Sequence, residues 1–98
     1  MLALSVMVET HPQFTAQYRE AVLRHAQNTL SREKGCLQFT VHEHAGQPDR
    51  FFLYEAYASK ADLEEVHNVA PYLKEFGDLT APWVKAKQIE RWAALPST

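Results

Sequence analysis

The hydrophobic period of the chain changes from helical to alternating along Gly35-Cys36-Leu37-Gln38-Phe39-Thr40-Val41. Leu37, Phe39 and Val41 alternate with polar residues, which is the pattern of a β-strand that has one apolar face. We therefore expect these three side chains to share one face of the strand. Gly35 is typical of the left-handed residue that ends a helix, so a helix is expected to come before the strand.

The residues before Gly35 predict a strand followed by that helix. Residues 2–9 are mostly apolar or β-branched, as in a buried strand. Pro12 suits the first turn of a helix, because its missing N–H is not needed there. The apolar residues of the helix recur every four positions and predict one buried face, made by Phe14, Tyr18, Val22, Ala26 and Leu30.

The residues after the strand predict a hairpin and the start of a second helical segment. Residues 45–49 are rich in turn formers, and the aromatic segment 50–58 returns as an antiparallel strand. Ser59 and Asp62 then have the spacing of a capping box, with Asp in place of the usual Glu.

The second helical segment is expected to run through Leu63 and His67 and to be interrupted by Pro71. Residues 72–76 predict one further helical turn, and residues 83–92 predict a last strand. The order is therefore β-α-β-β-α-β, the arrangement of an α+β, ferredoxin-like domain with an antiparallel sheet and its helices on one face.

One domain is expected over residues 1–98, with its core between about residues 2 and 92. If both helices cover one face of the sheet, the other face needs water or a partner. Glu55 and Tyr57 are expected on that second face. A second copy of the chain would cover it economically, so a two-fold homodimer is expected.

Composition excludes several classes of partner. A net charge of −2 and a pI near 6.2 give no basic footprint for nucleic acid. The apolar N-terminus is too short to span a bilayer and lacks the basic region of a signal peptide, so no membrane partner is expected. Cys36 is the single cysteine and cannot form an internal disulfide, which suits a cytoplasmic protein.

Four short segments, taken in order, resemble the signature of the antibiotic biosynthesis monooxygenase domain. That family typically shows a Glu-x-Gly-Cys turn, a Phe-x-x-x-Glu-x-Trp/Tyr segment and a His near the end of the second helix. The resemblance covers nearly the whole chain, from about Leu2 to Trp92. The matching segments are Glu33-Lys34-Gly35-Cys36-Leu37-Gln38-Phe39, Phe52-Leu53-Tyr54-Glu55-Ala56-Tyr57 (with Phe51 four before Glu55), Ala61-Asp62-Leu63 with His67, and Tyr72-Leu73.

The resemblance implies a dimeric α+β barrel with a pocket in each protomer between the sheet and the second-helix region. For many members it also implies oxidation of hydroquinone-like or polycyclic phenolic substrates by molecular oxygen, without a cofactor. The expected partners are therefore a small aromatic substrate and O2, and no cofactor is expected. Other members degrade haem or process a quorum-sensing signal, so the family narrows the chemistry without fixing it.

His67 is the first candidate for a catalytic base, because an imidazole titrates near neutral pH and could remove a proton from a phenolic substrate. Glu55 and Tyr57 lie two apart on a strand and so share a face. The carboxylate could orient the imidazole, and the phenol could donate to a substrate oxygen. The structural alternatives are a buried histidine bonded to backbone carbonyls, a salt bridge for Glu55 and core packing for Tyr57.

Four further residues are candidates for substrate binding: His42, Tyr72, Phe76 and Arg91. His42 and His44 share one strand face and could ligate a metal, but no third ligand is marked in the sequence. We therefore prefer pocket lining or hairpin surface for both, and no metal site is predicted. Arg91 could meet an anionic substrate or form an ion pair between subunits.

Several functions compete on this scaffold. The haem-degrading members of the family that the chain resembles combine an Asn on the first strand, a Trp on the sheet and the helix His. Residues 2–9 contain no Asn, and Tyr57 fills the position of the Trp, so haem degradation is disfavoured. An isomerase or a signal-processing or binding protein for a small metabolite remains an alternative, with Lys85, Lys87 and Arg91 available for an anion. A non-catalytic, stress-related dimer is the other alternative. A cofactor-independent monooxygenase is the leading hypothesis.

Overall fold

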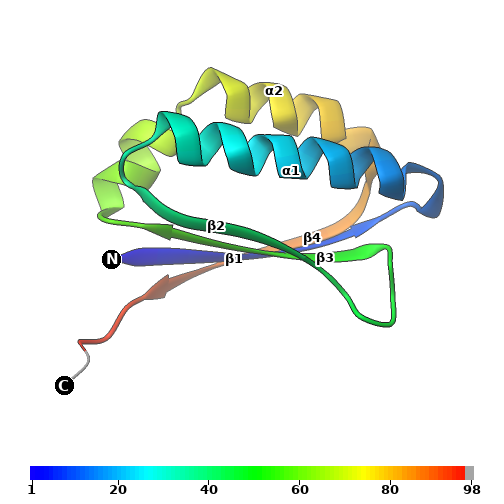
Figure 1. The fold of residues 1–98 in the computed structure, drawn as a ribbon, viewed down its shortest axis with the longest axis horizontal. Helices are drawn as coiled ribbons and strands as arrows, with labels where there is room; N and C mark the ends of the chain where they lie inside the picture. The colour runs from blue at the N-terminus through cyan, green and yellow to red at the C-terminus, as the bar shows by residue number, and fades with distance from the viewer. Residues whose placement is uncertain (97–98) are drawn as a thin grey trace.

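The computed structural model describes residues 1–96 and contains a four-stranded antiparallel sheet with both α-helices on one face (Figure 1). The strand order is β2-β3-β1-β4. This is the α+β, ferredoxin-like arrangement that the sequence predicted. In chain order the elements are β1 (Leu2–Thr10), η1 (Pro12–Phe14), α1 (Thr15–Arg32), β2 (Cys36–Glu43), β3 (Arg50–Tyr57), η2 (Asp62–His67), α2 (Pro71–Thr80), η3 (Ala81–Trp83) and β4 (Val84–Ala93).

The core lies between the sheet and the helix layer. β1 pairs with β3 on one side and with β4 on the other, so its inward side chains lie at the middle of the sheet. Alternation along β1 and β3 supplies most of the sheet's share of the core, as a period of two requires. The buried apolar cluster contains Leu4, Val6, Val8, Tyr18, Val22, Ala26, Cys36, Phe39, Phe51, Leu53, Tyr57 and Leu63.

α1 buries a different stripe from the one that its four-residue spacing predicted. A helix turns about 100° per residue, so positions four apart drift by about 40° at each step. Tyr18 and Val22 are buried as predicted, but Leu30 is 46% exposed. The inward positions near the end of α1 are instead His25 and Thr29. The drift therefore places an imidazole, and not a leucine, against the sheet.

β2 begins with an irregularity that turns Leu37 away from the core. Cys36 pairs with Tyr57 and Gln38 pairs with Ala56, so Leu37 is an extra residue without a cross-strand partner. Leu37 is 57% exposed whereas Phe39 is buried, so the prediction that these two side chains share a strand face was wrong. Cys36 takes the inward position in its place.

β3 directs Glu55 and Tyr57 toward the helices, which corrects the prediction that they lie on the open face of the sheet. Phe51 and Leu53 are core residues, and a period of two places Glu55 and Tyr57 on the same side. Leu4, the cross-strand partner of Glu55, is also buried. Polarity suggested the wrong face, whereas the spacing from Phe51 and Leu53 gives the right one.

The second helical segment consists of two pieces. η2 is a π-helix, in which the Asn68 N–H donates to the Leu63 carbonyl five residues earlier (2.8 Å), and His67 is its last residue. π-helical turns are rare and are frequent at functional sites. The prediction that Pro71 interrupts a helix was wrong. Pro71 is the first residue of α2, where its missing N–H costs nothing, and α2 continues through Gly77.

Gly35 is needed for close packing and not for a left-handed turn. Its φ is not positive, and α1 has already ended at Arg32, so the predicted left-handed stop was wrong. A Cβ on Gly35 would lie 2.2 Å from Cγ of Asp62. Asp62 is fixed at the start of η2 by Ser59, whose hydroxyl accepts its N–H (3.2 Å) and donates to its carboxylate (2.8 Å). Gly35 therefore sets how closely η2 approaches the β2 end of the sheet.

We predict that Gly35→Ala lowers the free energy of unfolding by about 1–3 kcal/mol, because the new methyl group must displace Asp62. The matched control is Gly77→Ala in α2, where an added Cβ meets nothing within 4 Å. That variant should be neutral or stabilised by up to about 1 kcal/mol. Chemical denaturation followed by circular dichroism measures both, and equal effects at the two glycines would contradict the packing role of Gly35.

Candidate functional site

A cluster of buried polar side chains lies between the sheet and the helix layer. Glu55 and Tyr57 come from the end of β3, His67 from the end of η2, and Glu33 from the residue that follows α1. Each of the four side chains belongs to a residue that is at most 5% exposed. Buried polar groups are costly unless they are paired, so their mutual geometry decides whether the cluster is tolerated.

The imidazole of His67 lies between two carboxylates. Its Nδ1 is 2.9 Å from Oε2 of Glu33, and its Nε2 is 3.7 Å from Oε1 of Glu55. The first contact is a hydrogen bond, whereas the second is too long for one. Tyr57 donates its hydroxyl to Oε1 of Glu55 (2.7 Å), and the hydroxyl of Tyr72 donates to Oε2 of Glu33.

Burial controls the protonation of the β3 pair. Desolvation raises the pKa of Glu55, although the hydrogen bond from Tyr57 opposes the shift. Desolvation and the neighbouring Glu55 both raise the pKa of the Tyr57 hydroxyl, so Tyr57 remains a hydrogen-bond donor at neutral pH. The cluster thus combines an imidazole with a carboxyl group that holds a proton more readily than usual. Such perturbed groups are typical of functional sites.

His25 lies beside this cluster and is itself buried. Its ring stacks on Phe76, with 4.3 Å between ring centroids, and lies 5.7 Å from the ring of His67. Its Nδ1 is buried without a hydrogen-bond partner in the part of the chain that the structure describes. Desolvation, followed by the charges of His67 and Lys87, lowers the pKa of His25 to about 4. His25 is therefore neutral at physiological pH.

A groove of about 180 Å³ between α1 and α2 borders the cluster from outside. Tyr72 and His25 line this groove, and they also reach the cluster through the hydrogen bond to Glu33 and the contact with the His67 ring. Phe76 lines the groove as well. The other lining residues are Ala21, Arg24, Asn28, Glu75 and Leu79.

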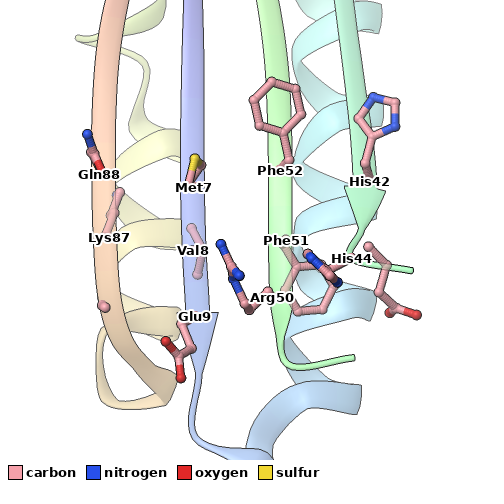
Figure 2. Close-up of a pocket in the computed structure, with 12 residues that line it drawn as sticks. Met7, Val8, Glu9, His42, His44, Arg50, Phe51, Phe52, Lys87 and Gln88 are labelled. Carbon is pink, nitrogen blue, oxygen red and sulfur yellow. The ribbon is translucent and has the colours of Figure 1, made fainter. Parts of the chain in front are cut away.

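A larger hollow of about 490 Å³ lies on the opposite, open face of the sheet (Figure 2). Figure 2 shows the strands of the sheet side by side with the helices behind them, and the rings of His42 and Phe52 next to each other on the near side. Their ring centroids are 5.8 Å apart. His44 and Arg50 line the hollow near the hairpin end. Because the sheet separates the two regions, this hollow is distinct from the His67 cluster.

Residues 1–78 match the family model described as antibiotic biosynthesis monooxygenase. The chain belongs to the antibiotic biosynthesis monooxygenase family. The match includes every residue of the His67 cluster and of the α1–α2 groove except Leu79, and it ends before β4. No curated protein matches the sequence significantly.

Several solved structures have the same fold as this protein, although their sequences are only distantly similar to it. A candidate antibiotic biosynthesis monooxygenase from Nitrosomonas europaea is 25% identical, with a TM-score of 0.90 and coverage of 98% of this chain and 100% of that chain. A second, from Deinococcus radiodurans, is 22% identical, with a TM-score of 0.90 and coverage of 100% and 96%. A third, from Caulobacter crescentus, is 23% identical, with a TM-score of 0.90 and coverage of 97% and 90%.

The structure of this family member brings together most of the residues that the sequence singled out. His67, Glu55 and Tyr57 are in mutual contact, and Tyr72 joins them through Glu33. The groove residue Phe76 reaches the cluster only through its stack on His25, and two other candidates lie apart. His42 is on the open face, and Arg91 lies on β4 with its guanidinium 3.6 Å from the carboxylate of Glu64.

Sequence reasoning missed Glu33 and His25 as members of the site. Glu33 stood in the Glu-x-Gly-Cys segment, but only its motif position was noted and not its partner. His25 is not one of the residues that the four-residue spacing selects, so that spacing gave no sign of its inward direction. Within residues 1–96 no group of three or more His, Cys, Asp and Glu side chains is placed to hold a metal ion, and no helix there is long and apolar enough to cross a membrane.

We predict that His25 lowers the free energy of unfolding of this protein in mild acid. As the pH falls from about 6.5 toward 4, His25 takes up a proton in the unfolded chain but not in the folded one, so the free energy of unfolding decreases. His25→Phe preserves the stack on Phe76 and removes this effect. The free energy of unfolding of His25→Phe minus that of the wild type should therefore rise by about 2 kcal/mol between pH 7 and pH 5.

Denaturant unfolding at a series of pH values measures this difference, and every other titrating group is common to both proteins. A gap that does not change with pH would show that the folded protein protonates His25 as readily as the unfolded chain does.

Proposed function

We propose that this protein is a cofactor-independent monooxygenase that oxidises a small hydroquinone with O2. The observation that carries the proposal is a buried imidazole, His67, held between the carboxyl groups of Glu33 and Glu55 in a member of the antibiotic biosynthesis monooxygenase family. Such a set can remove a proton from a phenol in a site that is screened from water, where electrostatic interactions are strong.

The proposed reaction balances without an added reductant. One oxygen atom of O2 enters the ring in place of a hydrogen, the other leaves as water, and the hydroquinone becomes a hydroxyquinone. All four electrons that O2 accepts come from the substrate. The protein then has to supply only a base, hydrogen-bond donors and a site that keeps the reacting groups together.

In this proposal, Nε2 of His67 is the base. It lies 3.7 Å from Oε1 of Glu55, so no direct hydrogen bond occupies it. Removing a phenolic proton produces the electron-rich phenolate that reacts with O2. Glu55, whose raised pKa makes it hold a proton more readily than usual, is then the group that hydrogen-bonds to an oxygen atom of the substrate. Tyr57 orients Glu55 through the hydroxyl that it donates to Oε1.

Access to His67 is proposed to run through the α1–α2 groove. His67 is only 3% exposed and lines neither the groove nor the open-face hollow. Tyr72 separates the groove from Glu33, so its side chain must move to admit a ligand. A groove of about 180 Å³ is smaller than the roughly 300–1,000 Å³ of drug-sized ligand sites. This favours a single-ring hydroquinone over a polycyclic phenol.

We predict that the wild-type protein consumes O2 with a single-ring hydroquinone above the autoxidation background, without added metal or flavin. His67→Ala should lower kcat by about 100-fold or more, because general-base catalysis contributes about that much. An oxygen electrode measures the uptake, and mass spectrometry with ¹⁸O2 shows one labelled atom in the product.

The matched control is His11→Ala, since His11 precedes η1 and makes no side-chain capping bond. Its activity should equal that of the wild type. No uptake from a panel of hydroquinones and polycyclic phenols would overturn the oxygenase proposal. Uptake that persists in His67→Ala would move the base to another residue.

We further propose that two copies of the chain pack through the open faces of their sheets. Both α-helices lie on the other side of the sheet (Figure 1), and this face carries exposed apolar side chains. Met7 and Phe52 are cross-strand partners there and are 40% and 38% exposed. Trp92, 52% exposed, donates its indole N–H to Ser5 on the same face (2.7 Å). A second copy would remove this apolar surface from water.

We predict that Phe52→Asp converts the dimer to a monomer, because a charge would be buried at the centre of the proposed interface. The control is Leu30→Asp on α1, where a side chain of similar exposure lies away from the open face. It should remain dimeric. Sedimentation velocity gives the mass of each protein, and a wild-type monomer at micromolar concentration would contradict the proposal.

A further inference from the structure

We infer that Glu33 is a positioning residue, which fixes the tautomer of His67 so that Nε2 is free to accept a proton. The catalytic consequence rests on the proposed function, but the tautomer itself does not. The motivating geometry is the 2.9 Å contact between Nδ1 of His67 and Oε2 of Glu33, with both side chains 4% exposed. The two residues are 34 positions apart in the chain.

The carboxylate of Glu33 acts as a hydrogen-bond acceptor for two neighbouring side chains. The hydroxyl of Tyr72 and Nδ1 of His67 both meet the same oxygen, Oε2. An ionised carboxylate has no proton to donate and can accept both bonds. Nδ1 therefore carries the hydrogen of the neutral ring. Nε2 is left with its lone pair, on the side that faces Glu55.

This assignment matters because a neutral imidazole has only one basic nitrogen. Which nitrogen is basic is set by the hydrogen bond that the other one makes. Without Glu33, the ring of His67 could hold its hydrogen on Nε2 and could not act as a base there. The same logic applies wherever a carboxylate holds the Nδ1–H of a catalytic histidine.

Glu33 also matches the charged form of His67 better than the neutral form. Its second oxygen, Oε1, is buried and has no hydrogen-bond partner among residues 1–96. A buried carboxylate with one unsatisfied oxygen is costly while its neighbour is neutral, and orphaned groups of this kind often indicate function. When His67 takes a proton, the two side chains become an ion pair. The contact is therefore stronger after proton transfer, which is what a catalytic contact requires.

The side chain of Glu33 is not needed to end α1. The contacts that end the helix use its backbone: its N–H donates to the carbonyl of Thr29 (3.0 Å), and its carbonyl accepts the N–H of Cys36 (3.1 Å). These bonds persist when the side chain is changed. Glu33→Leu nevertheless leaves the buried donors of His67 and Tyr72 without their acceptor, so it should lower the free energy of unfolding. Circular dichroism therefore establishes that each variant is folded before its spectrum is read.

The test is the ring nitrogen spectrum of His67. Long-range ¹H–¹⁵N correlation spectra are recorded at a series of rising pH values until the ring signals stop changing, and the tautomer is read at that limit. The signals of His67 are assigned by their loss in His67→Ala. We expect the wild type to hold its hydrogen on Nδ1, and Glu33→Leu to shift it at least partly to Nε2. An unchanged Nδ1–H form in the variant would overturn the inference.

Two further variants keep this result interpretable. Tyr72→Phe removes the other donor to Glu33 but keeps the Nδ1 contact, so it should retain the Nδ1–H form. If Glu33→Leu fails to fold, Glu33→Met gives the same readout, since a thioether of similar length is only a weak acceptor. A rise in the Nε2–H form then supports the inference, and none overturns it.

Kinetics separate this inference from the proposed function. If hydroquinones are substrates, Glu33→Leu should lower kcat by at least about 100-fold and at most about 10⁴-fold with little change in KM, since about 10⁴-fold is lost when the carboxylate that fixes the tautomer of a catalytic histidine is replaced. If the wild type shows no oxygen uptake, the proposed function fails, while the nitrogen spectrum still decides the role of Glu33. A changed tautomer with unchanged kcat would reject the catalytic consequence alone.

Discussion

The alternation of β3 places two polar side chains inside the protein, and the site is built around that constraint. Phe51 and Leu53 anchor the strand in the core, so Glu55 and Tyr57 must follow them to the same side. A carboxyl group there would be costly without partners. The hydrogen bond from Tyr57 and the nearby imidazole of His67 offset that cost, so an acid-base set occupies the place of ordinary apolar packing.

Two chain segments converge on this position, and each arrives for a local reason. α1 ends at Arg32, so Glu33 leaves the helix with its side chain directed inward. η2 is wound as a π-helix and delivers His67 at its end. The absence of a side chain at Gly35 allows Asp62, at the start of η2, to approach closely. A modest shift in either of these segments would lengthen the 2.9 Å contact between His67 and Glu33.

The two faces of the sheet have separate roles in the proposed function. The covered face holds the His67 cluster and the α1–α2 groove, while the open face holds a larger hollow and the exposed Met7 and Phe52. Volume alone would place the substrate in the open-face hollow. The covered face is favoured instead because it combines buried, mutually contacting ionisable groups, which is the arrangement that acid-base chemistry needs.

The sequence by itself determined the α+β class, the element order and the family resemblance, because hydrophobic period and short motifs are local properties. It also placed His67, Glu55 and Tyr57 among the site candidates. The inward turn of His25, the outward turn of Leu37 and the partner of His67 were decided only by the tertiary structure. Helical drift and a strand irregularity set the first two. The third depends on residues 34 positions apart, whose meeting is fixed by how α1 and η2 pack on the sheet, which no local pattern encodes.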